Sequence, residues 1–529
     1  MQDLWKTCLL HVLIVIFPLA TVSRAAPSTL GREVSMSTRL ADGEEFKLSL
    51  PELIAYGRKL FTAQWTVQEG AGRPLSKGTG ASLVNPAAPL VFPRNFNRLS
   101  GPDANSCAGC HNAPFGIPGG SGDIITSAFV LGQRFDFIDF DSTVSSPMSQ
   151  SHDETGRMVP LHSMANLRAT TGMYGSGYLE MLARQMTADL HAIRDSTPLG
   201  KTRALVSKGV AFGSIKRIID ERWDIANITG LGAASIASFG YDPPSLLVMP
   251  FHQSGAAVSL RQFTNNALNH HHGLQSSERF GTDTDPDGDG FTNELSRAEV
   301  TALTLYQATM PVPGRVIPHR RMIEAEVLLG ERKFEQVGCD RCHVLKLPLR
   351  GAQYSEPNPY NPLGNLQPDA VSALMFDLNS GELPQPRLQA EDGVTWVPAY
   401  TDLKLHDITS GPQDPNREAL DMQHQPGMKG FFVGNRYFIT RPLWGMANQP
   451  PYFHHGKFTT IREAIQAHAG EAQPVMDAYE ALSPAEKSSL IEFLKTLQVL
   501  PPGTRTLVID DTGQPRQWPP HWARHNPVR

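Results

Sequence analysis

The sequence lacks a cysteine that is available for a disulfide. Of its five cysteines, Cys8 lies in the N-terminal apolar segment and the other four form two Cys-x-x-Cys-His sequences. A strong excess of charge of one sign is also missing, because 47 Lys and Arg stand against 52 Asp and Glu, for a formal net charge of -5. We therefore expect no disulfide framework, and neither nucleic acid nor an anionic membrane as a partner.

A hydrophobic run that could span a membrane is missing as well. The apolar stretch Leu9–Val22 is shorter than the roughly 20 residues that a spanning helix needs, and no later segment approaches that length. The positive Lys6 precedes this stretch, and small residues follow it at the positions that a signal peptidase reads. We predict a signal peptide over residues 1–25, cleavage after Ala25, and a periplasmic or secreted mature protein without a membrane span.

The four remaining cysteines form two copies of one motif, Cys107-Ala-Gly-Cys110-His111 and Cys339-Asp-Arg-Cys342-His343. Two thiols one helical turn apart can add to the two vinyl groups of one porphyrin, and the adjacent histidine can then bind the iron as the proximal ligand. A Cys₄ zinc site or a redox-active dithiol would not require a histidine after both pairs. The sequence therefore predicts two covalently bound c-type haems.

The motifs lie in two copies of a larger module. Gly57-Arg-Lys-Leu-Phe61 precedes the first motif, and Gly330-Glu-Arg-Lys-Phe334 precedes the second. Downstream, Pro160-Leu-His-Ser-Met-Ala-Asn166 and Pro442-Leu-Trp-Gly-Met-Ala-Asn448 share five of seven residues in register. Matching segments in the same order around both motifs indicate an internal duplication.

Apolar residues recur at helical spacing around both motifs, in the ranges Pro51–Gln64, Tyr178–Ile193, Arg297–Ala308, Arg321–Gln336 and Pro484–Leu497. We therefore predict a mainly α fold of two tandem c-type cytochrome domains, with long loops and an inserted segment between them. The expected boundaries are 45–200 for the N-terminal haem domain, 201–315 for the insertion, 316–500 for the C-terminal haem domain and 501–529 for a surface tail.

The insertion contains a dense acidic segment, Asp283-Thr-Asp-Pro-Asp-Gly-Asp-Gly-Phe-Thr-Asn-Glu294. It fits the calcium-loop pattern Asp-x-Asp-x-Asp-Gly-x₅-Glu, although Gly290 replaces the usual apolar residue and a second register begins at Asp285. A plain acidic turn is the alternative. Because carboxylates at this density repel one another without a cation, we expect a structural Ca²⁺ held by Asp283, Asp285, Asp287, Asp289 and Glu294.

These motifs resemble the bacterial di-haem cytochrome c peroxidase superfamily, and its di-haem oxidoreductase branch in particular. The resemblance covers about residues 51–500 and depends on Cys107–Pro114 with Gly119-Gly120, Gly177–Glu180, Asp283–Ala308, and Arg441–His454 with Gly456. In this superfamily one haem receives electrons and the other meets the oxidant. We therefore expect the same division of roles between the two haems of this chain.

The resemblance implies a second ligand for the C-terminal haem. Pro451-Tyr-Phe-His454 with Gly456 resembles the family signature, in which the distal Met lies fourteen residues after the His. That position is His468 here, which implies a bis-His haem with a lower potential than a His/Met pair. The alternative is a solvated histidine on an amphipathic helix. His454 and His455 are implied to lie beside the haem rather than on its iron.

The N-terminal haem departs from the family pattern. The family's distal His corresponds to Ser127, and no histidine occurs between His111 and His152. We expect an iron with an open or exchangeable sixth site, and His152 or His162 would close that site in the alternative case. Weaker candidates for a haem or metal ligand are His252 and the triplet His270-His271-His272.

Peroxide cleavage needs an acid/base that moves a proton between the two oxygens, and a polar group that supports the charge. The resemblance makes Glu180 the first candidate for the acid/base. It places Gln185 at the family's active-site Gln, and Asp195 corresponds to the family's own Glu. The alternative for each is an exposed helix residue.

The resemblance also predicts the reaction. We expect a peroxidase that reduces hydrogen peroxide, or another oxidant, with electrons from a small cytochrome or cupredoxin that enter at the His343 haem. The family's inter-haem Trp corresponds to Gly175, so Tyr174 or Trp444 would have to replace it. Two alternatives stay open: a high-valent haem pair that oxidises or oxygenates an organic or protein substrate, and a plain electron-transfer cytochrome.

Overall fold

The computed structural model describes residues 31–72, 104–122, 125–129, 151–152, 158–159, 165–424, 430 and 433–525. The predicted signal peptide and His162 lie outside the described residues, and only the backbone is described for Ser127 and His152. Within the described ranges, no helix has the length and apolar character needed to cross a membrane.

The fold is not mainly α, contrary to the expectation from the sequence. Helices make up 31% and strands 16% of the structure, which has 12 helices and several small sheets among its described residues. The strands are short, from two residues in β2 (Ser151–His152) to eight in β6 (Val210–Arg217), and they form sheets of two or three strands. Such short strands show little alternation of polar and apolar residues, so helical periodicity dominated the sequence pattern.

The main helices form close to where the periodicity predicts them: α1 (Leu50–Thr62), α3 (Ser176–Asp195), α7 (Arg297–Ala308), α8 (Arg321–Val337) and α11 (Pro484–Lys495). α11 begins with a capping box between Ser483 and Glu486 and has proline in its first turn. The shorter helices are α2 (Cys107–Cys110), α4 (Ala233–Ile236), α5 (Leu260–Ala267), α6 (Ser277–Phe280), α9 (Ile461–Gln466), α10 (Gln473–Glu480) and α12 (His521–His525).

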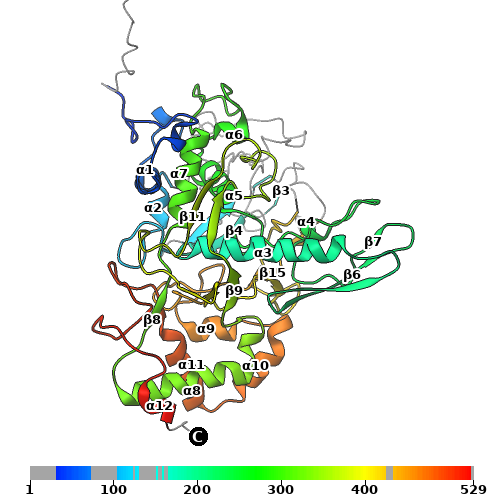
Figure 1. Ribbon diagram of the computed structural model, residues 1–529, viewed down its shortest axis with the longest axis vertical. Helices are drawn as coiled ribbons and strands as arrows, with labels where there is room; N and C mark the ends of the chain where they lie inside the picture. Colours follow the sequence, from blue (N-terminus) through cyan, green and yellow to red (C-terminus); the bar gives the residue numbers. More distant parts are fainter. Residues whose placement is uncertain are drawn as a thin grey trace, which may run out of the picture.

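The duplicated glycines make the same helix contact in both halves. α1 packs against α7, and α8 packs against α11 (Figure 1). A Cβ at Gly57 would lie 2.0 Å from the carbonyl oxygen of Ala302, and a Cβ at Gly330 would lie 2.0 Å from that of Ser489. Only glycine lets the two backbones approach so closely. Each half therefore packs the helix before its haem motif tightly against a second helix.

The small sheets connect segments that are distant in the sequence. β5 (Thr202–Ser207), β6 and β7 (Trp223–Asp224) form an antiparallel sheet that projects from the body of the molecule (Figure 1). The remaining pairings are β1 (Ile125–Phe129) with β4 (Ala165–Ala169), β2 with β3 (Met158–Val159), β9 (Leu347–Arg350) with β13 (Val394–Val397), β13 with β12 (Ala390–Glu391), β10 (Gln353–Glu356) with β11 (Leu374–Asp377), β14 (Leu405–Asp407) with β15 (Tyr437–Ile439), and β8 (Gly314–Val316) with both β16 (Leu497–Gln498) and β17 (Val508–Ile509).

Residues from both halves of the chain share the larger hydrophobic core. It contains Tyr178 of α3 together with Trp444 from the C-terminal half, whereas a smaller core joins Phe334 of α8 to Phe493 of α11. The C-terminal residues pack along α8, where the indole N–H groups of Trp518 and Trp522 donate hydrogen bonds to Glu331 and Glu324. The domain boundaries stay a prediction.

Candidate haem-binding active site

Both Cys-x-x-Cys-His motifs line one cavity of about 530 Å³, a volume typical of cofactor pockets. The first motif begins in α2 and the second in the 3₁₀ turn η6 (Cys339–Arg341). None of the four cysteines forms a disulfide. Burial raises the pKa of the Cys107 and Cys339 thiols to about 12, whereas redox-active dithiols have a lowered pKa. These cysteines therefore fit covalent attachment of a cofactor better than thiol exchange.

The two motif histidines are oriented in the same way. His111 Nδ1 lies 3.0 Å from the carbonyl oxygen of Gly120, and His343 Nδ1 lies 3.1 Å from that of Tyr400. A carbonyl oxygen only accepts, so Nδ1 donates, and Nε2 of each neutral ring keeps its lone pair for a metal. Burial lowers the pKa of both histidines to about 4. Both are therefore neutral near pH 7, as metal-binding imidazoles must be.

The duplicated phenylalanines support these histidines. The ring centre of Phe61 lies 6.0 Å from that of His111, and the ring centre of Phe334 lies 6.4 Å from that of His343. Both phenylalanines are buried and line the cavity. The duplicated Gly-x-x-x-Phe segment therefore plays the same structural role in both halves. Its glycine allows a neighbouring helix to pack closely, and its phenylalanine packs beside the motif histidine.

His468 faces His343 in the cavity. Their ring centres are 6.5 Å apart and their planes are inclined by 66°. Two imidazoles that bind one metal, each with a nitrogen about 2 Å from it, have ring centres about 6 Å apart. His468 Nδ1 donates to the carbonyl oxygen of Ala464 at 2.8 Å, and burial lowers the pKa of the imidazole. The residues present therefore fit an iron held between the two Nε2 atoms.

The other histidines of the signature segment lie nearby. His454 lines the cavity and stacks on Phe438, with ring centres 3.9 Å apart. His455 Nε2 lies 2.8 Å from Asn416 Oδ1. Phe453 packs edge-on against His468, with ring centres 5.6 Å apart. These aromatic contacts form one wall of the cavity beside His468.

The histidine triplet reaches the cavity beside the first motif. His270, His271 and His272 lie in η5 (Leu268–His272), a π-helix, and all three line the cavity. His272 Nδ1 lies 2.7 Å from the carbonyl oxygen of Ala104, and its Nε2 lies 3.3 Å from Cys107 Sγ. The triplet thus connects the inserted segment directly to the first haem motif, a link that spacing along the chain does not reveal.

His252 and Arg168 form a polar region of the same cavity. His252 has a positive φ of 69°, which is strained for a residue with a side chain. Its Nδ1 lies 2.7 Å from Ser254 Oγ, and its buried Nε2 has no hydrogen-bond partner among the described residues. Burial, with nearby Arg168 and His271, lowers the pKa of His252 well below its ordinary value. His252 is therefore a neutral imidazole with a nitrogen free for chemistry.

Comparison with known proteins finds one family match, in the C-terminal part of the chain. Residues 374–497 match the family described as "Di-haem oxidoreductase, putative peroxidase". No curated protein matches the chain. Among solved structures, a hydrazine synthase from Kuenenia stuttgartiensis pressurised with 20 bar xenon is 13% identical, with a TM-score of 0.32, and the match covers 88% of this chain and 97% of that chain.

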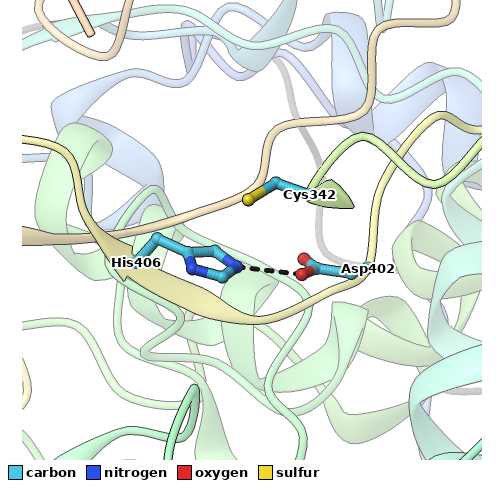
Figure 2. A group of neighbouring side chains, drawn as sticks. All are labelled: Cys342, Asp402 and His406. Carbon is cyan, nitrogen blue, oxygen red and sulfur yellow. Dashed lines mark hydrogen bonds and ion pairs between the residues drawn. The ribbon is translucent and has the colours of Figure 1, made fainter. Parts of the chain in front are cut away.

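The family segment contains His468 and a charged group that sequence reasoning missed. His406 lies between two carboxylates, with its Nε2 2.9 Å from Asp402 Oδ2 and its Nδ1 2.8 Å from Glu471 Oε2. Cys342 Sγ lies near Asp402 and His406 (Figure 2). The ligand atoms of these three residues all lie within 4.8 Å of one another. Because the predicted covalent haem would use this sulfur, we regard the group as a charged neighbour of the second haem motif and not as a separate metal site.

The pKa of His406 reflects its position between the carboxylates. Burial alone would lower it, but hydrogen bonds to Asp402, Cys342 and Glu471 raise it to about 11. His406 is therefore an imidazolium near pH 7. Asp402-x-x-x-His406 was the only local signal for this group, because Glu471 joins it from 65 residues away.

Glu180, the first candidate for the acid/base, lies in a buried network outside the cavity that both haem motifs line, which we call the di-haem cavity. Its carboxylate pairs with Arg184 and accepts hydrogen bonds from the backbone N–H of Leu260 at 2.9 Å, Asn358 Nδ2 at 2.7 Å and the Tyr354 hydroxyl at 3.2 Å. Glu180 does not line the cavity. These contacts are those of a structural ion pair, and its catalytic role stays a prediction.

Gln185 and Asp195 also lie outside the cavity lining. Gln185 Nε2 donates to the carbonyl oxygen of Arg350 at 2.7 Å, and Gln185 Oε1 accepts from Lys208 Nζ at 2.6 Å. Asp195, the last residue of α3, pairs with Arg194 at 2.8 Å and is largely exposed. The structure therefore does not bring either residue together with the haem motifs, and their roles also stay predictions.

The acidic loop brings together three of its five predicted ligands. Asp285, Asp287 and Asp289 have carboxylate oxygens within 4.8 Å of one another. Asp285 accepts backbone N–H groups from residues 288 to 290 at 2.8–3.1 Å. Asp283 instead accepts from Asn293, and Glu294 accepts from the backbone of residue 275. This arrangement corresponds to the register that begins at Asp285.

Proposed function

We propose that this protein is an exported di-haem c-type oxidoreductase that reduces hydrogen peroxide with electrons from a small redox protein. One observation carries the proposal: both haem motifs line one cavity, but their surroundings differ. His343 has an imidazole, His468, directly opposite, whereas the polar region with His252 and Arg168 opens into the same space. Export rests on the sequence of residues 1–25.

Haem, when bound, supplies iron that passes single electrons from a donor to an oxidant. His111 and His343 would hold the two irons, and the four cysteines would hold the porphyrins. His468 would occupy the remaining position beside His343 and leave no room there for an oxidant. This arrangement supports electron entry at the His343 haem and peroxide reduction at the His111 haem.

The reduction of hydrogen peroxide to two waters takes up two electrons and two protons, so the site needs a group that moves protons. We assign this task to His252, whose buried Nε2 has no hydrogen-bond partner among the described residues and whose lowered pKa keeps the ring neutral. Arg168 lines the same cavity and would stabilise negative charge that develops on the oxygen. Glu180 is the competing assignment from the sequence.

The acidic loop would hold a structural Ca²⁺. Asp285, Asp287 and Asp289 supply the hard oxygen donors that this cation prefers. The loop leads into α7, which packs against α1, the helix of the N-terminal half that precedes the first haem motif in the sequence. Calcium would therefore stabilise the N-terminal half without taking part in the reaction.

The decisive experiment begins with the purified full-length protein from a host that attaches c-type haem. Intact mass and pyridine haemochrome analysis should both give two haems per chain, and peroxide should oxidise a reduced cytochrome in its presence. A single haem, or haem that acid acetone extracts, contradicts the di-haem assignment. Two low-spin haems without peroxide turnover indicate an electron carrier, and oxygen uptake with an organic substrate indicates the other enzyme class.

A further inference from the structure

Arginines outnumber acidic side chains along the described lining of the cavity that the two haem motifs share. Among the described residues that line it, the arginines are Arg168, Arg341 and Arg441, and Glu471 is the only acidic side chain. Glu471 is already bound to the His406 imidazolium. A buried guanidinium without a counter-ion is costly. The cavity is therefore suited to a ligand that brings negative charge.

Arg441 is the clearest case of an unbalanced charge in this cavity. Its guanidinium has no hydrogen bond or ion pair in the part of the chain that the structure describes. Burial lowers the pKa of Arg441, and nearby Tyr452 opposes this effect only in part. Arg168, by contrast, has Glu418 at 4.0 Å. Among the described residues, the partly buried Arg441 therefore lacks the partner that an arginine in a cavity wall normally has.

The backbone places Arg441 beside the second haem motif. His343 Nδ1 donates to the carbonyl oxygen of Tyr400 at 3.1 Å. On either side of Tyr400, Leu443 N–H donates to the carbonyl oxygen of Ala399 at 3.0 Å, and the Thr401 hydroxyl donates to that of Thr440. The segment that orients His343 is thus bonded to the segment that carries Arg441.

A haem brings two propionate carboxylates, and guanidinium binds a carboxylate through two parallel hydrogen bonds. We propose that Arg441 binds a propionate of the His343 haem, and thereby orients this haem and sets its reduction potential. The inference rests on the proposed di-haem function. In the duplicated register Arg441 corresponds to Val159, so the first half has no equivalent cation and the effect belongs to one haem.

The test is a spectroelectrochemical titration of both haems in the full-length holoprotein. Arg441→Met should keep two covalent haems but lower the potential of the bis-His haem, because an unbalanced propionate charge stabilises ferric iron. The His111 haem should shift less. Arg441→Lys, which keeps the charge, should restore most of the potential. Arg436→Met is the matched control, since it removes the same charge from a half-exposed arginine and should change neither potential.

The possible outcomes separate the sources of the carboxylate. If Arg441 binds a free anion instead, added acetate should shift the wild-type potential, and Arg441→Met should abolish that response without changing the potential in its absence. This result overturns the propionate assignment. Two haems with unchanged potentials in Arg441→Met and Arg441→Lys also overturn it and leave the proposed function intact. Absence of covalent haem from the wild type contradicts the proposed function itself.

Discussion

The indole ring of Trp444 occupies the space in which a side chain at Gly175 would lie. A Cβ at Gly175 would be 2.5 Å from Trp444 Cζ2, and Gly175 has a φ of 72°. Trp444 is buried and lines the cavity shared by the two haem motifs. In the family that the sequence resembles, the inter-haem Trp corresponds to Gly175. We therefore propose that Trp444, from the C-terminal half of this chain, takes the place of that family's Trp.

We expect Trp444 to carry electrons between the haems. Trp444→Leu should keep both haems and their spectra but slow the oxidation of the His343 haem after the reduced protein is mixed with peroxide. Stopped-flow absorbance measures this step. Tyr174→Phe is the control, because Tyr174 also lines the cavity but loses only a buried hydroxyl that has no partner in the described part of the chain. If Tyr174→Phe slows the step and Trp444→Leu does not, the path runs through Tyr174.

His468→Met should keep the His343 haem six-coordinate and low-spin but raise its potential, because a thioether stabilises ferrous iron better than imidazole does. The ring separation of 6.5 Å between His343 and His468 motivates the change. Spectroelectrochemistry and electron paramagnetic resonance follow the two haems separately. If neither the potential nor the spectrum of either haem moves, His468 is not an iron ligand.

His252→Gln should slow the reaction of the protein with peroxide by roughly 10²-fold or more, as expected for a lost acid/base. Haem content, and reduction of the His343 haem by the donor, should be unchanged, since the variant affects only proton movement. Stopped-flow mixing with peroxide measures the first quantity, and anaerobic mixing with the reduced donor measures the second. A wild-type peroxide rate would remove His252 from the mechanism.

Glu180→Gln provides the comparison for this experiment. The substitution removes a charge that pairs with buried Arg184, so we expect a lower free energy of unfolding, by about 3 kcal/mol for a broken buried pair. The folded variant should react with peroxide at nearly the wild-type rate. The opposite pattern, unchanged stability with slow peroxide reduction, would identify Glu180 as the acid/base.

Removal of calcium should lower the melting temperature. A cation at 100 times its dissociation constant stabilises the native state by about 2.7 kcal/mol. Calorimetry with a chelator and then with added Ca²⁺ should show a reversible loss. Asp287→Asn should weaken this response, because Asp287 belongs to the cluster of three aspartates. Asp283→Asn should keep it, because Asp283 bonds to Asn293 instead. Equal melting temperatures with and without the cation would exclude a bound calcium.

The free energy of unfolding should fall as the pH rises from 6.5 to 11, the interval between the ordinary pKa of histidine and that of His406 in the fold. Because folding raises this pKa, the native state binds the proton more tightly. The resulting stabilisation is complete below pH 6.5 and is lost progressively as the pH rises toward 11. His406→Asn should reduce the alkaline slope. Denaturant titrations across this interval compare the two proteins, and parallel curves would show that Asp402 and Glu471 do not hold a charged imidazole.

The sequence alone determined the local features. The haem motifs, the duplicated Gly-x-x-x-Phe segments and the main helices each depend on residues within a few turns of one another, so spacing along the chain is enough to locate them. The short strands were missed for a matching reason: two to eight residues contain too little alternation to compete with the helical pattern.

Only the tertiary structure decided which of these features meet. The family resemblance pointed to Glu180 and Gln185, but the face of α3 that meets the cavity depends on how residues such as Tyr354 pack against it. The surroundings of His252, Arg441 and His406 could not be read from spacing along the chain, because their neighbours come from segments far apart in the sequence. Burial in a shared cavity is a property of the packed chain, and spacing along the sequence does not contain it.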